Sequence, residues 1–449
     1  MANTGKPAPV PPTDRVRSVL RAHLCAGARL CLGYSGGLDS TVLLHMLTAL
    51  RGPMDFRLHA VHVHHGLSPR ADEWQRHCEA VCRTWDIPLR VEKVAVCRQG
   101  KGIEAAARAA RYAVYARQAA DFIVLAHQLD DQAETVLLNL LRGSGVRGLA
   151  AMPVSRPLAA DAPLNLLRPL LGTGRDELES YARRHYLTWI EDESNLDTGL
   201  ARNHLRREVM PVLRGPFPEY RQAVARAAAH MAECSELLDD LARLDGGPPE
   251  ADGSLDLSRL SGLTPARAAN LLRYHLRQSG LNAPSEAALA DLLRQLAGAA
   301  EDRVTQWRQG DAVMRVWRGR LHTIGRVADE DGRRVWRGED ELEFAGGRLL
   351  FVRVTGQGLS RDRLAGRLVT LRRRQGGERL QTDASRPRRA LKKMLQESGI
   401  PPWERSRLPL LFVDDELAWV AQVGTDTAFQ AQARQPGLII EWQPPTPRP

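Results

Sequence analysis

The sequence is poor in the residues that mark secreted and membrane proteins. Only six of its 449 residues are cysteine, and no two of them are spaced as Cys-x-x-Cys. This is too sparse for a disulfide scaffold, so we expect reduced thiols and a cytoplasmic localisation. The N-terminal stretch MANTGKPAPVPPTDR is rich in proline and lacks the apolar core of a signal peptide. No apolar run is long enough to span a bilayer, so we expect no membrane partner.

Common metal-binding and phosphate-binding patterns are missing as well. The glycine-rich turn described below is not followed by the lysine of a Walker-type loop. The HxE and PCxxC signature of zinc cytidine deaminases is absent. Cys78 and Cys82 follow His62, His64 and His65 in the sequence, but they fall on an amphipathic helical pattern. This favours buried thiols over a structural zinc site.

Positive charge is in surplus and is concentrated towards the C-terminal end. The formal net charge is +10 and the sequence pI is about 9.7. Residues 361–400 contain twelve Arg and Lys and four Asp and Glu, which gives a local net charge of +8. We expect that the acids in this segment are too few to neutralise it. This favours a nucleic-acid partner, with a solvated basic face as the alternative. The basic cluster comprises Arg372, Arg373, Arg374, Arg379, Arg388, Arg389, Lys392 and Lys393.

The stretch RLCLGYSGGLDSTVLLHMLTAL, from Arg29 to Leu50, organises the rest of the chain. Its first residues, Leu30 to Tyr34, form an apolar run typical of a buried strand. The small residues of Ser35–Ser40 interrupt that run, and apolar residues at helical spacing follow them. A strand, a glycine-rich turn and a helix form an anion site, because backbone N–H groups at the helix start point at the ligand. An ordinary turn between strand and helix is the alternative.

Strands and helices alternate through the N-terminal region. Strand-like runs at Phe56–Val63, Leu89–Val96 and Phe122–Ala126 are separated by helical patterns at Ala71–Trp85 and Glu104–Ala120. This alternation predicts an α/β fold with a parallel sheet that is covered on both faces. Ligands of such sheets bind beyond the carboxyl ends of the strands. We therefore expect Ser35–Ser40, His64–His65 and His127–Asp131 to surround one crevice.

Charged residues on two of these helices are candidates for the ligand site. Asp131 and Glu134 are three residues apart and share a helix face, where they could hold magnesium or a cationic substrate. A solvated first helical turn is the alternative. Arg108 and Arg111 follow Glu104 at helical spacing. An arginine aimed at phosphate and an intrahelical salt bridge are equally open interpretations.

A dense polar segment closes this region and leads into a helix. Its polar residues are Asp192, Ser194, Asn195, Asp197, Arg202, Asn203 and Arg206. Arginine and asparagine suit contacts with phosphates and bases, so the segment is a candidate RNA contact. A plain loop followed by a basic helix is the alternative.

Changes in composition predict the domain limits. We expect a disordered extension at residues 1–13, an α/β domain at 14–214, a mainly helical domain at 215–345, a basic α+β domain at 346–440 and a disordered tail at 441–449. In the last domain the pattern predicts a basic helix from Arg388 to Gly399 and a hairpin about Asp414–Asp415. Strand-like runs at 312–316, 321–324 and 349–354 are expected to link the helical domain to the last one.

Several of these stretches match the motifs of one family. SGGLDS at Ser35–Ser40 resembles the SGGxDS loop of the N-type ATP pyrophosphatase, or PP-loop, superfamily. Further matches are HVHHGL at His62–Leu67, the ExxxR helix at Glu104–Arg108, HQLDDQAET at His127–Thr135, RGSG at Arg142–Gly145, DESNLDTGLARNHLR at Asp192–Arg206, RQGGER at Arg374–Arg379 and IPPWER at Ile400–Arg405. Together they resemble the tRNA(Ile)-lysidine synthetase family. The resemblance is weakest from 215 to 354.

The resemblance implies an ATP-dependent ligase that acts on isoleucine tRNA with a CAU anticodon. The C2 carbonyl oxygen of the wobble cytidine would be adenylated, with release of pyrophosphate. The ε-amine of free L-lysine would then attack C2 and expel AMP. The resulting lysidine changes the codon that is read from AUG to AUA. ATP and magnesium are the implied cofactors, and a homodimer is the candidate assembly.

The same resemblance assigns roles to individual residues. ATP would bind at Ser35, Gly36, Gly37, Leu38, Asp39 and Ser40, with Asp39 as the candidate magnesium ligand. The candidate catalytic residues are Asp39, Arg108, Asp131 and Glu134. Of these, Arg108 would meet phosphate, and the last two would meet the lysine ammonium or magnesium. The candidate residues for binding the tRNA are Asn195, Arg202, Asn203, Arg206, Arg373, Arg379, Arg388 and Lys392.

Three competing functions remain at this point. A tRNA thiolase of the same superfamily also adenylates a base, but it generally needs paired reactive cysteines, which are missing here. An amide-forming synthetase of the superfamily would not need a basic C-terminal domain. A non-catalytic RNA-binding protein would explain the basic residues but not SGGLDS.

Overall fold

The structure is a computed structural model, and it describes residues 10–96, 102–159, 163–191, 201–250, 252–282, 284–298, 306–309, 312–324 and 332–444. The candidate site residue Asn195 lies outside these ranges. So do residues 1–9 and 445–449, most of the two ends that we expect to be disordered. The chain divides into two compact units, Met1–Asp240 and Leu241–Pro449. In the described part of the chain, no helix is long and apolar enough to cross a bilayer.

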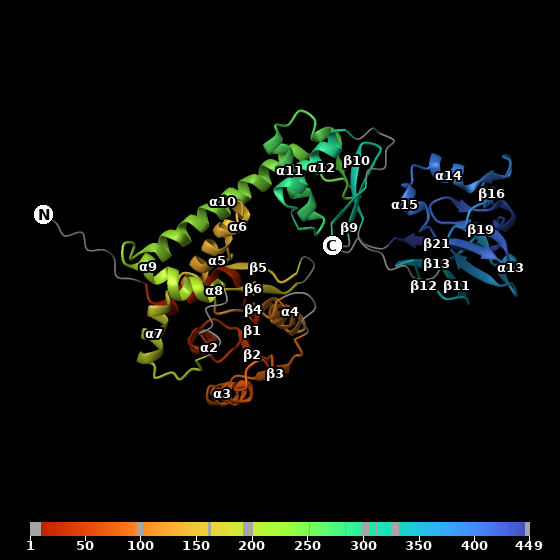
Figure 1. The fold of residues 1–449 in the computed structure, drawn as a ribbon. Helices are drawn as coiled ribbons and strands as arrows, with labels where there is room; N and C mark the ends of the chain where they lie inside the picture. Colours follow the sequence, from red (N-terminus) through yellow and green to blue (C-terminus); the bar gives the residue numbers. More distant parts are fainter. Residues whose placement is uncertain are drawn as a thin grey trace. The chain divides into compact units, whose positions relative to one another are not determined.

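The N-terminal unit is built on a six-stranded sheet with the strand order β3-β2-β1-β4-β6-β5 (Figure 1). The strands are β1 (Arg29–Gly33), β2 (Arg57–His64), β3 (Leu89–Lys93), β4 (Phe122–Val124), β5 (Ser155–Pro157) and β6 (Asn165–Leu167). All neighbours are parallel except β5, which runs antiparallel to β6 at the edge. The predicted parallel sheet is confirmed. The sequence patterns did not reveal β5 and β6, because three residues are too few to show a period.

Helices cover both faces of this sheet. The helices up to residue 214 are α1 (Pro12–His23), α2 (Leu38–Arg51), α3 (Ala71–Thr84), α4 (Ile103–Tyr115), α5 (Leu129–Leu141), α6 (Val146–Leu149), α7 (Arg175–Arg184), α8 (Ala201–His204) and α9 (Met210–Arg214), with a π-helical turn at Leu205–Val209. On β1, Leu30 and Leu32 belong to a core that also contains residues of α1, α2 and α7, whereas Cys31 packs on the other face with residues of α4. Side chains alternate between the faces of a strand, so a sheet covered on both sides needs apolar residues at successive positions.

The strand order fixes the place of a ligand crevice. The chain runs outward from β1 to β2 and β3, then returns to β4 on the other side of β1. Ligands of such sheets bind beyond the carboxyl ends of the strands at the point where the order reverses. Here those ends lead into Ser35–Ser40 after β1 and into His127 after β4. The topology therefore brings the glycine-rich loop and His127 to one edge of the sheet.

Helices and a small sheet form the first part of the second unit. The elements are the end of α10 (Tyr220–Gly246), α11 (Pro265–Gln278), α12 (Glu286–Ala297), β7 (Leu255–Asp256), β8 (Gln306–Gln309), β9 (Ala312–Trp317) and β10 (Arg320–Ile324). The strands form one sheet in the order β7-β10-β9-β8. Leu272 of α11, Leu292 of α12 and Met314 of β9 share its core. The strands predicted at 312–316 and 321–324 thus pack on the helices and do not link them to the next sheet.

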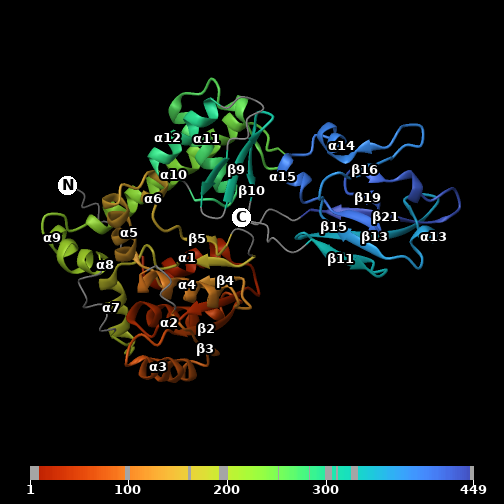
Figure 2. The same cartoon turned by 45° about the vertical axis from the view of Figure 1, so that its right-hand side comes forward.

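Two antiparallel sheets share the core of the C-terminal part (Figure 2). One has the order β11-β15-β18-β19-β20 and the other has the order β12-β13-β21-β14. The elements are β11 (Arg333–Trp336), β12 (Glu341–Phe344), β13 (Gly347–Thr355), β14 (Leu359–Ser360), α13 (Arg361–Leu364), β15 (Val369–Arg372), β16 (Arg379–Leu380), β17 (Arg389–Ala390), α14 (Leu391–Glu397), α15 (Pro402–Arg405), β18 (Leu410–Val413), β19 (Glu416–Val420), β20 (Gly424–Thr425) and β21 (Pro436–Gln443). The predicted hairpin at Asp414–Asp415 is confirmed, since β18 pairs with β19.

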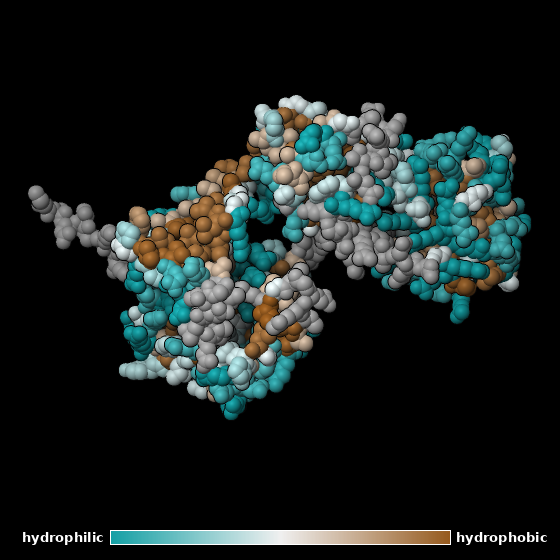
Figure 3. Space-filling view, viewed as in Figure 1, coloured by the Kyte–Doolittle hydropathy of each residue, from teal (hydrophilic) through white to brown (hydrophobic). Residues whose placement is uncertain are grey.

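The predicted basic helix from Arg388 to Gly399 is shorter than expected. Arg389 and Ala390 form β17, which pairs with β16, and α14 begins only at Leu391. The strand pairing satisfies backbone groups that a longer helix would have used. Gly399 has a φ of 71° and follows the end of α14, as predicted. On the face in Figure 3, the surface of the C-terminal sheets is mostly hydrophilic.

Candidate active site at the carboxyl edge of the parallel sheet

The Ser35–Ser40 loop joins β1 to α2 through a turn that requires glycine. Gly36 has a φ of +82°, and a Cβ there would lie 2.6 Å from Ile190 Cδ1 and 2.8 Å from Cys78 Sγ. The Gly36 carbonyl oxygen also accepts a hydrogen bond from the Ile190 N–H at 2.9 Å. A larger residue would strain the backbone and push these neighbours apart.

Hydroxyl groups hold the loop in shape. Ser35 Oγ lies 3.0 Å from Ser40 Oγ, and Ser40 Oγ donates to the Gly37 carbonyl oxygen at 3.0 Å. Gly37 directly precedes α2, and no described side chain caps that helix. The first N–H groups of α2 therefore stay available for an anion.

Asp39 presents a buried oxygen to the same place. Its Oδ1 has no hydrogen-bond partner among the described residues. Burial raises the pKa of Asp39 to about 7 and the carboxylate of Asp131 adds to the shift, whereas Arg175 and Arg206 oppose it. A cation beside such a carboxylate would stabilise its ionised form. Asp39 thus fits a magnesium ligand, which stays a prediction.

Asp131 and Glu134 lie on one face of α5, and two arginines hold both of them. Arg206 Nε donates to Glu134 Oε1 at 2.6 Å, and Arg202 Nε donates to Glu134 Oε2 at 2.7 Å. Both guanidinium groups also reach Asp131 Oδ1, at 2.9 Å from Arg202 and 3.2 Å from Arg206. The Glu134 side chain is 0% exposed. Two acids and two arginines therefore form a charge-balanced cluster.

Sequence reasoning assigned the members of this cluster to different ligands. Asp131 and Glu134 were expected to face lysine or magnesium, and Arg202 and Arg206 were expected to face tRNA. The structure brings all four together, across a separation of 68 residues between Glu134 and Arg202. Asn203, another tRNA candidate of this segment, is buried.

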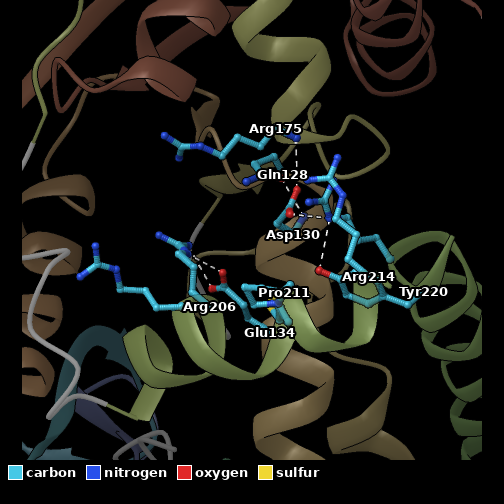
Figure 4. A pocket seen from close by; sticks show the side chains of 11 residues that line it. Gln128, Asp130, Glu134, Arg175, Arg206, Pro211, Arg214 and Tyr220 are labelled. Atoms are coloured by element: carbon cyan, nitrogen blue, oxygen red, sulfur yellow. Dashed lines mark hydrogen bonds and ion pairs between the residues drawn. The ribbon is translucent and has the colours of Figure 1, made fainter. Parts of the chain in front are cut away.

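A pocket of about 400 Å³ opens beside the cluster (Figure 4). It is lined by Gln128, Asp130, Glu134, Arg175, Arg206, Arg207, Met210, Pro211, Arg214, Tyr220 and Arg221. Asp130 accepts a hydrogen bond from the Arg175 N–H at 3.1 Å and pairs with Arg221 Nε at 2.7 Å. Five arginines against two carboxylates make the lining cationic, which suits an anionic group. Sequence reasoning missed Arg175 and Arg221, whereas Asp130 lies within the stretch His127–Asp131 that was expected at the crevice.

Arg108 lies on the exposed side of α4. Its Nη2 donates to the Tyr112 hydroxyl at 3.1 Å, and its guanidinium carbon lies 5.0 Å from the centre of the Tyr112 ring. The side chain of Glu104, its candidate salt-bridge partner, is outside the described part of the chain. The phosphate and salt-bridge interpretations of Arg108 therefore both stay open.

His127 and Arg168 meet at the ends of neighbouring strands. Arg168 Nε donates to His127 Nδ1 at 3.3 Å. Burial lowers the pKa of His127 to about 3 and the charge of Arg168 adds to the shift, so this imidazole is neutral at pH 7. Sequence reasoning missed Arg168, although an arginine directly after the apolar run Leu164–Leu167 was a signal of a strand end.

Three family models match the chain. A PP-loop domain matches residues 14–213, a TilS substrate binding domain matches 255–322 and a TilS substrate C-terminal domain matches 369–442. The tRNA(Ile)-lysidine synthase of Nitrosomonas europaea is 41% identical over 99% of this chain and 98% of its own length. That of Pseudomonas aeruginosa is 44% identical over 98% of this chain and 99% of its own length. The chain belongs to the tRNA(Ile)-lysidine synthase family.

Family membership decides between the functions that the sequence left open. The match to the PP-loop model confirms a domain that uses ATP, as the SGGLDS loop predicted. Both C-terminal models belong to the lysidine synthase family, so the thiolase alternative is not favoured. Cys78 and Cys82 are buried, which confirms the predicted buried thiols, and Cys78 Sγ lies 3.5 Å from His62 Nδ1.

In the family's C-terminal domain, acids pair with much of the basic cluster. The pairs are Arg372–Asp415 at 3.0 Å, Arg374–Glu378 at 3.4 Å, Arg388–Asp426 at 2.9 Å and Arg389–Glu397 at 2.5 Å. Glu378 and Glu397 lie within residues 361–400 and are two of the four acids already counted in the local net charge of +8. Asp415 and Asp426 come from later turns, and the fold brings them to Arg372 and Arg388 of the basic segment. Lys392 is exposed on α14 and pairs with no described acid.

Proposed function

We propose that the chain is an ATP-dependent ligase that joins free L-lysine, through its ε-amine, to C2 of the wobble cytidine of isoleucine tRNA with a CAU anticodon. The product reads AUA in place of AUG. The relatives that align over nearly the whole chain carry the name tRNA(Ile)-lysidine synthase. The observation that supports the proposal is that Asp39 of the Ser35–Ser40 loop lies close enough to Asp131 and Arg206 of the charge-balanced cluster for their charges to influence its pKa.

In the first step, the C2 oxygen of the cytidine attacks the α-phosphorus of ATP and pyrophosphate leaves. The N–H groups at the start of α2 and the Ser35–Ser40 loop are proposed to hold the phosphates. Arg108 offers a fork of donors to the same phosphates. Magnesium, when bound, neutralises phosphate charge, and Asp39 would hold it through its buried oxygen. Adenylation gives C2 a good leaving group, so no protein nucleophile is needed.

In the second step, the lysine ε-amine attacks C2, and AMP leaves with the former carbonyl oxygen. The ammonium must first lose a proton, which a nearby carboxylate can accept. We assign this role to Asp131 and Glu134. Because Arg202 and Arg206 hold these carboxylates, lysine binding requires at least one guanidinium to move. An RNA phosphate that attracts Arg202 or Arg206 would free the carboxylates, so we expect tRNA to promote lysine binding.

The remaining candidate residues are proposed to bind the tRNA backbone. They are Asn195, Asn203, Arg373, Arg379 and Lys392. Arg388 pairs with Asp426, whose side chain is 0% exposed, so we expect Arg388 to act mainly on the fold. We also propose a cytoplasmic enzyme, where its tRNA and ATP occur, and a homodimer. Light scattering of the purified protein tests the assembly.

The test of the function is lysine transfer in a purified system. Wild-type protein, ATP and an isoleucine tRNA transcript with a CAU anticodon are incubated with labelled lysine. Label should enter the RNA. Pyrophosphate release should require tRNA, and AMP release and continued turnover should require both tRNA and lysine. The matched control is the same transcript with uridine at the wobble position. Release of AMP and pyrophosphate without labelled RNA would indicate another modification by a PP-loop enzyme.

A further inference from the structure

Arg108, Arg156 and Arg168 lie around Tyr112 near the carboxyl end of β6, and Arg111 lies on the same helix, α4, as Tyr112. The guanidinium carbons of Arg108 and Arg156 lie 5.0 Å and 5.9 Å from the centre of the Tyr112 ring. Arg168 directly follows β6; burial lowers the pKa of its guanidinium, and the neighbouring Tyr112 opposes that shift. Arg111 lies 3.5 Å from His65 Nε2, through its Nη2. We call Arg108, Arg111, Arg156 and Arg168 the arginine cluster.

Arg168 forms the buried base of the arginine cluster. It is only 2% exposed. Its side chain donates to uncharged acceptors, namely the Pro153 carbonyl oxygen at 2.8 Å and His127 Nδ1 at 3.3 Å. A buried guanidinium normally has a carboxylate partner, because an unpaired charge is costly to remove from water. Within the described ranges, no carboxylate pairs with Arg168.

The other members of the arginine cluster also lack a described acidic partner. The side chain of Arg108 donates to the Tyr112 hydroxyl, and that of Arg156 donates to the Pro157 carbonyl oxygen at 3.0 Å. The nearby histidines add no negative charge. Burial, followed by the charge of Arg111, lowers the pKa of His65 to about 4, so it is neutral at pH 7. The positive charge of the cluster is thus left uncompensated by these neighbours.

The arginine cluster extends from solvent to the protein interior. Arg108 and Arg111 are exposed on α4, Arg156 and Tyr112 are half-buried, and Arg168 is buried. The cluster lies at the same edge of the sheet as the Ser35–Ser40 loop, but on the strand ends of β4 and β6 instead of β1. Two places for anions therefore lie side by side, one made of backbone N–H groups and one made of guanidinium groups.

We propose that the arginine cluster is a second phosphate-binding subsite beside the Ser35–Ser40 loop, with Arg168 as its buried base. The ligand is a phosphate group next to the reacting cytidine. It belongs either to the RNA backbone or to the nucleotide, since both carry the same chemistry. Guanidinium forks bind phosphate oxygens in pairs, so several arginines fix both its position and its orientation. The inference rests on the proposed function, because both phosphates come from its substrates.

Two variants test the subsite. Arg111→Gln combined with Arg156→Gln removes two of its charges at accessible positions. Arg168→Lys keeps the charge at the base but removes the planar fork of donors. The matched control is Arg117→Gln, which changes an exposed arginine just beyond α4. The probes are pyrophosphate, by calorimetry, and the isoleucine tRNA transcript, by filter binding over a range of salt concentrations.

A phosphate contact in the subsite predicts a loss of affinity of about ten- to a hundredfold for one of the two probes in both variants. If the phosphate belongs to RNA, the salt slope of tRNA binding should flatten by about 0.7 to 0.9 for each lost contact, and pyrophosphate binding should stay constant. If it belongs to the nucleotide, pyrophosphate binding should fall and the tRNA slope should stay constant. Arg117→Gln should match the wild type with both probes.

The proposal is wrong if the double variant binds both probes like the wild type. The double variant still tests the proposal if Arg168→Lys fails to fold. Arg111 and Arg156 are accessible positions, so their substitution should leave the fold intact. Thermal melting of each variant identifies such a failure. A failure of the proposed function is separate, since the wild-type protein would then not transfer lysine to the transcript at all.

Discussion

Arg206 donates a hydrogen bond from Nε to Oε1 of the buried Glu134 at 2.6 Å. This contact links a residue that we assign to RNA binding with a residue that we assign to lysine binding. The carboxylate that we assign to lysine is satisfied by an arginine that we assign to RNA. A lysine ammonium must therefore compete with a guanidinium that binds a carboxylate through two parallel hydrogen bonds. Lysine binding should depend on the presence of tRNA for this reason.

Arg202→Gln should increase the affinity for free lysine in the absence of tRNA. The substitution removes donors from Glu134 Oε2 and Asp131 Oδ1. One charge-assisted hydrogen bond contributes roughly 1.5–3 kcal/mol, so we expect about a tenfold gain. Calorimetric titration with lysine measures it, and Arg183→Gln, which changes an exposed arginine on α7, is the control. Equal lysine affinities in Arg202→Gln and the wild type would rule out the competition.

Glu134→Gln should raise the KM for lysine by about ten- to a hundredfold, because a charged contact to the ammonium is lost. The affinity for tRNA should stay close to that of the wild type. Saturation of AMP formation with lysine measures the first effect, and filter binding measures the second. Glu179→Gln, on α7, removes a carboxylate from a more exposed ion pair and should change neither. An unchanged KM in Glu134→Gln would place the lysine pocket elsewhere.

Features that depend on residues adjacent in the sequence could be predicted, whereas features that depend on residues far apart in the sequence could not. The Ser35–Ser40 loop was predictable because its strand, turn and helix follow one another directly. The pairing of Glu134 with Arg206 was not, because 72 residues separate them and only the packed fold brings them together. Arg168 was missed for a similar reason, since its neighbours Tyr112 and His127 come from other parts of the chain.

Local sequence patterns were also misleading where pairing with a distant strand determined the secondary structure. The segment after Arg388 is basic and has helical periodicity, yet its first residues pair with Arg379–Leu380 as a strand. Composition alone does not show that partner. The charge of the same segment was overestimated, because Asp415 and Asp426 return to it from later parts of the chain.

Asp39→Asn should change the pH dependence of stability. The pKa of Asp39 is raised to about 7 from 3.8, so between these pH values the folded state binds more protons than the unfolded chain. This contribution to the free energy of unfolding is present at low pH and is lost as the pH rises towards about 7. Asp39→Asn avoids burying a charge, so it should be more stable than the wild type at pH 8, by roughly 1–3 kcal/mol.

Urea denaturation at pH 5 and pH 8 measures the effect of Asp39→Asn, with Asp86→Asn as a control at a fully exposed side chain. Pyrophosphate release should be lost in Asp39→Asn and kept in the control. The assignment of Asp39 is wrong if Asp39→Asn releases pyrophosphate at the wild-type rate. The pKa argument is wrong if the two variants show the same pH dependence of stability.

Gly36→Ala should disrupt the loop more than strain of the backbone alone explains. Gly27 has a φ of +76°, close to the +82° of Gly36, but a Cβ at Gly27 would meet nothing within 4 Å. Gly27→Ala should therefore lower the free energy of unfolding by only the cost of the left-handed backbone conformation, about 1–2 kcal/mol. Gly36→Ala should cost more and slow pyrophosphate release, because its Cβ would contact Ile190 and Cys78. Equal losses of stability in a urea titration would show that these contacts are unimportant.

Substitutions of Arg388 and Lys392 should distinguish the two roles of the basic C-terminal segment, which are stabilising the fold and binding tRNA. Lys392 is exposed and pairs with no described acid, so Lys392→Ala should leave the melting temperature unchanged. If it contacts a tRNA phosphate, the variant should weaken tRNA binding and flatten its salt slope by about 0.7 to 0.9. Arg388→Ala should instead lower the free energy of unfolding, by about 1–2 kcal/mol, because the buried Asp426 loses its ion pair. A salt slope unaltered by Lys392→Ala would mean that this face of α14 contacts only water.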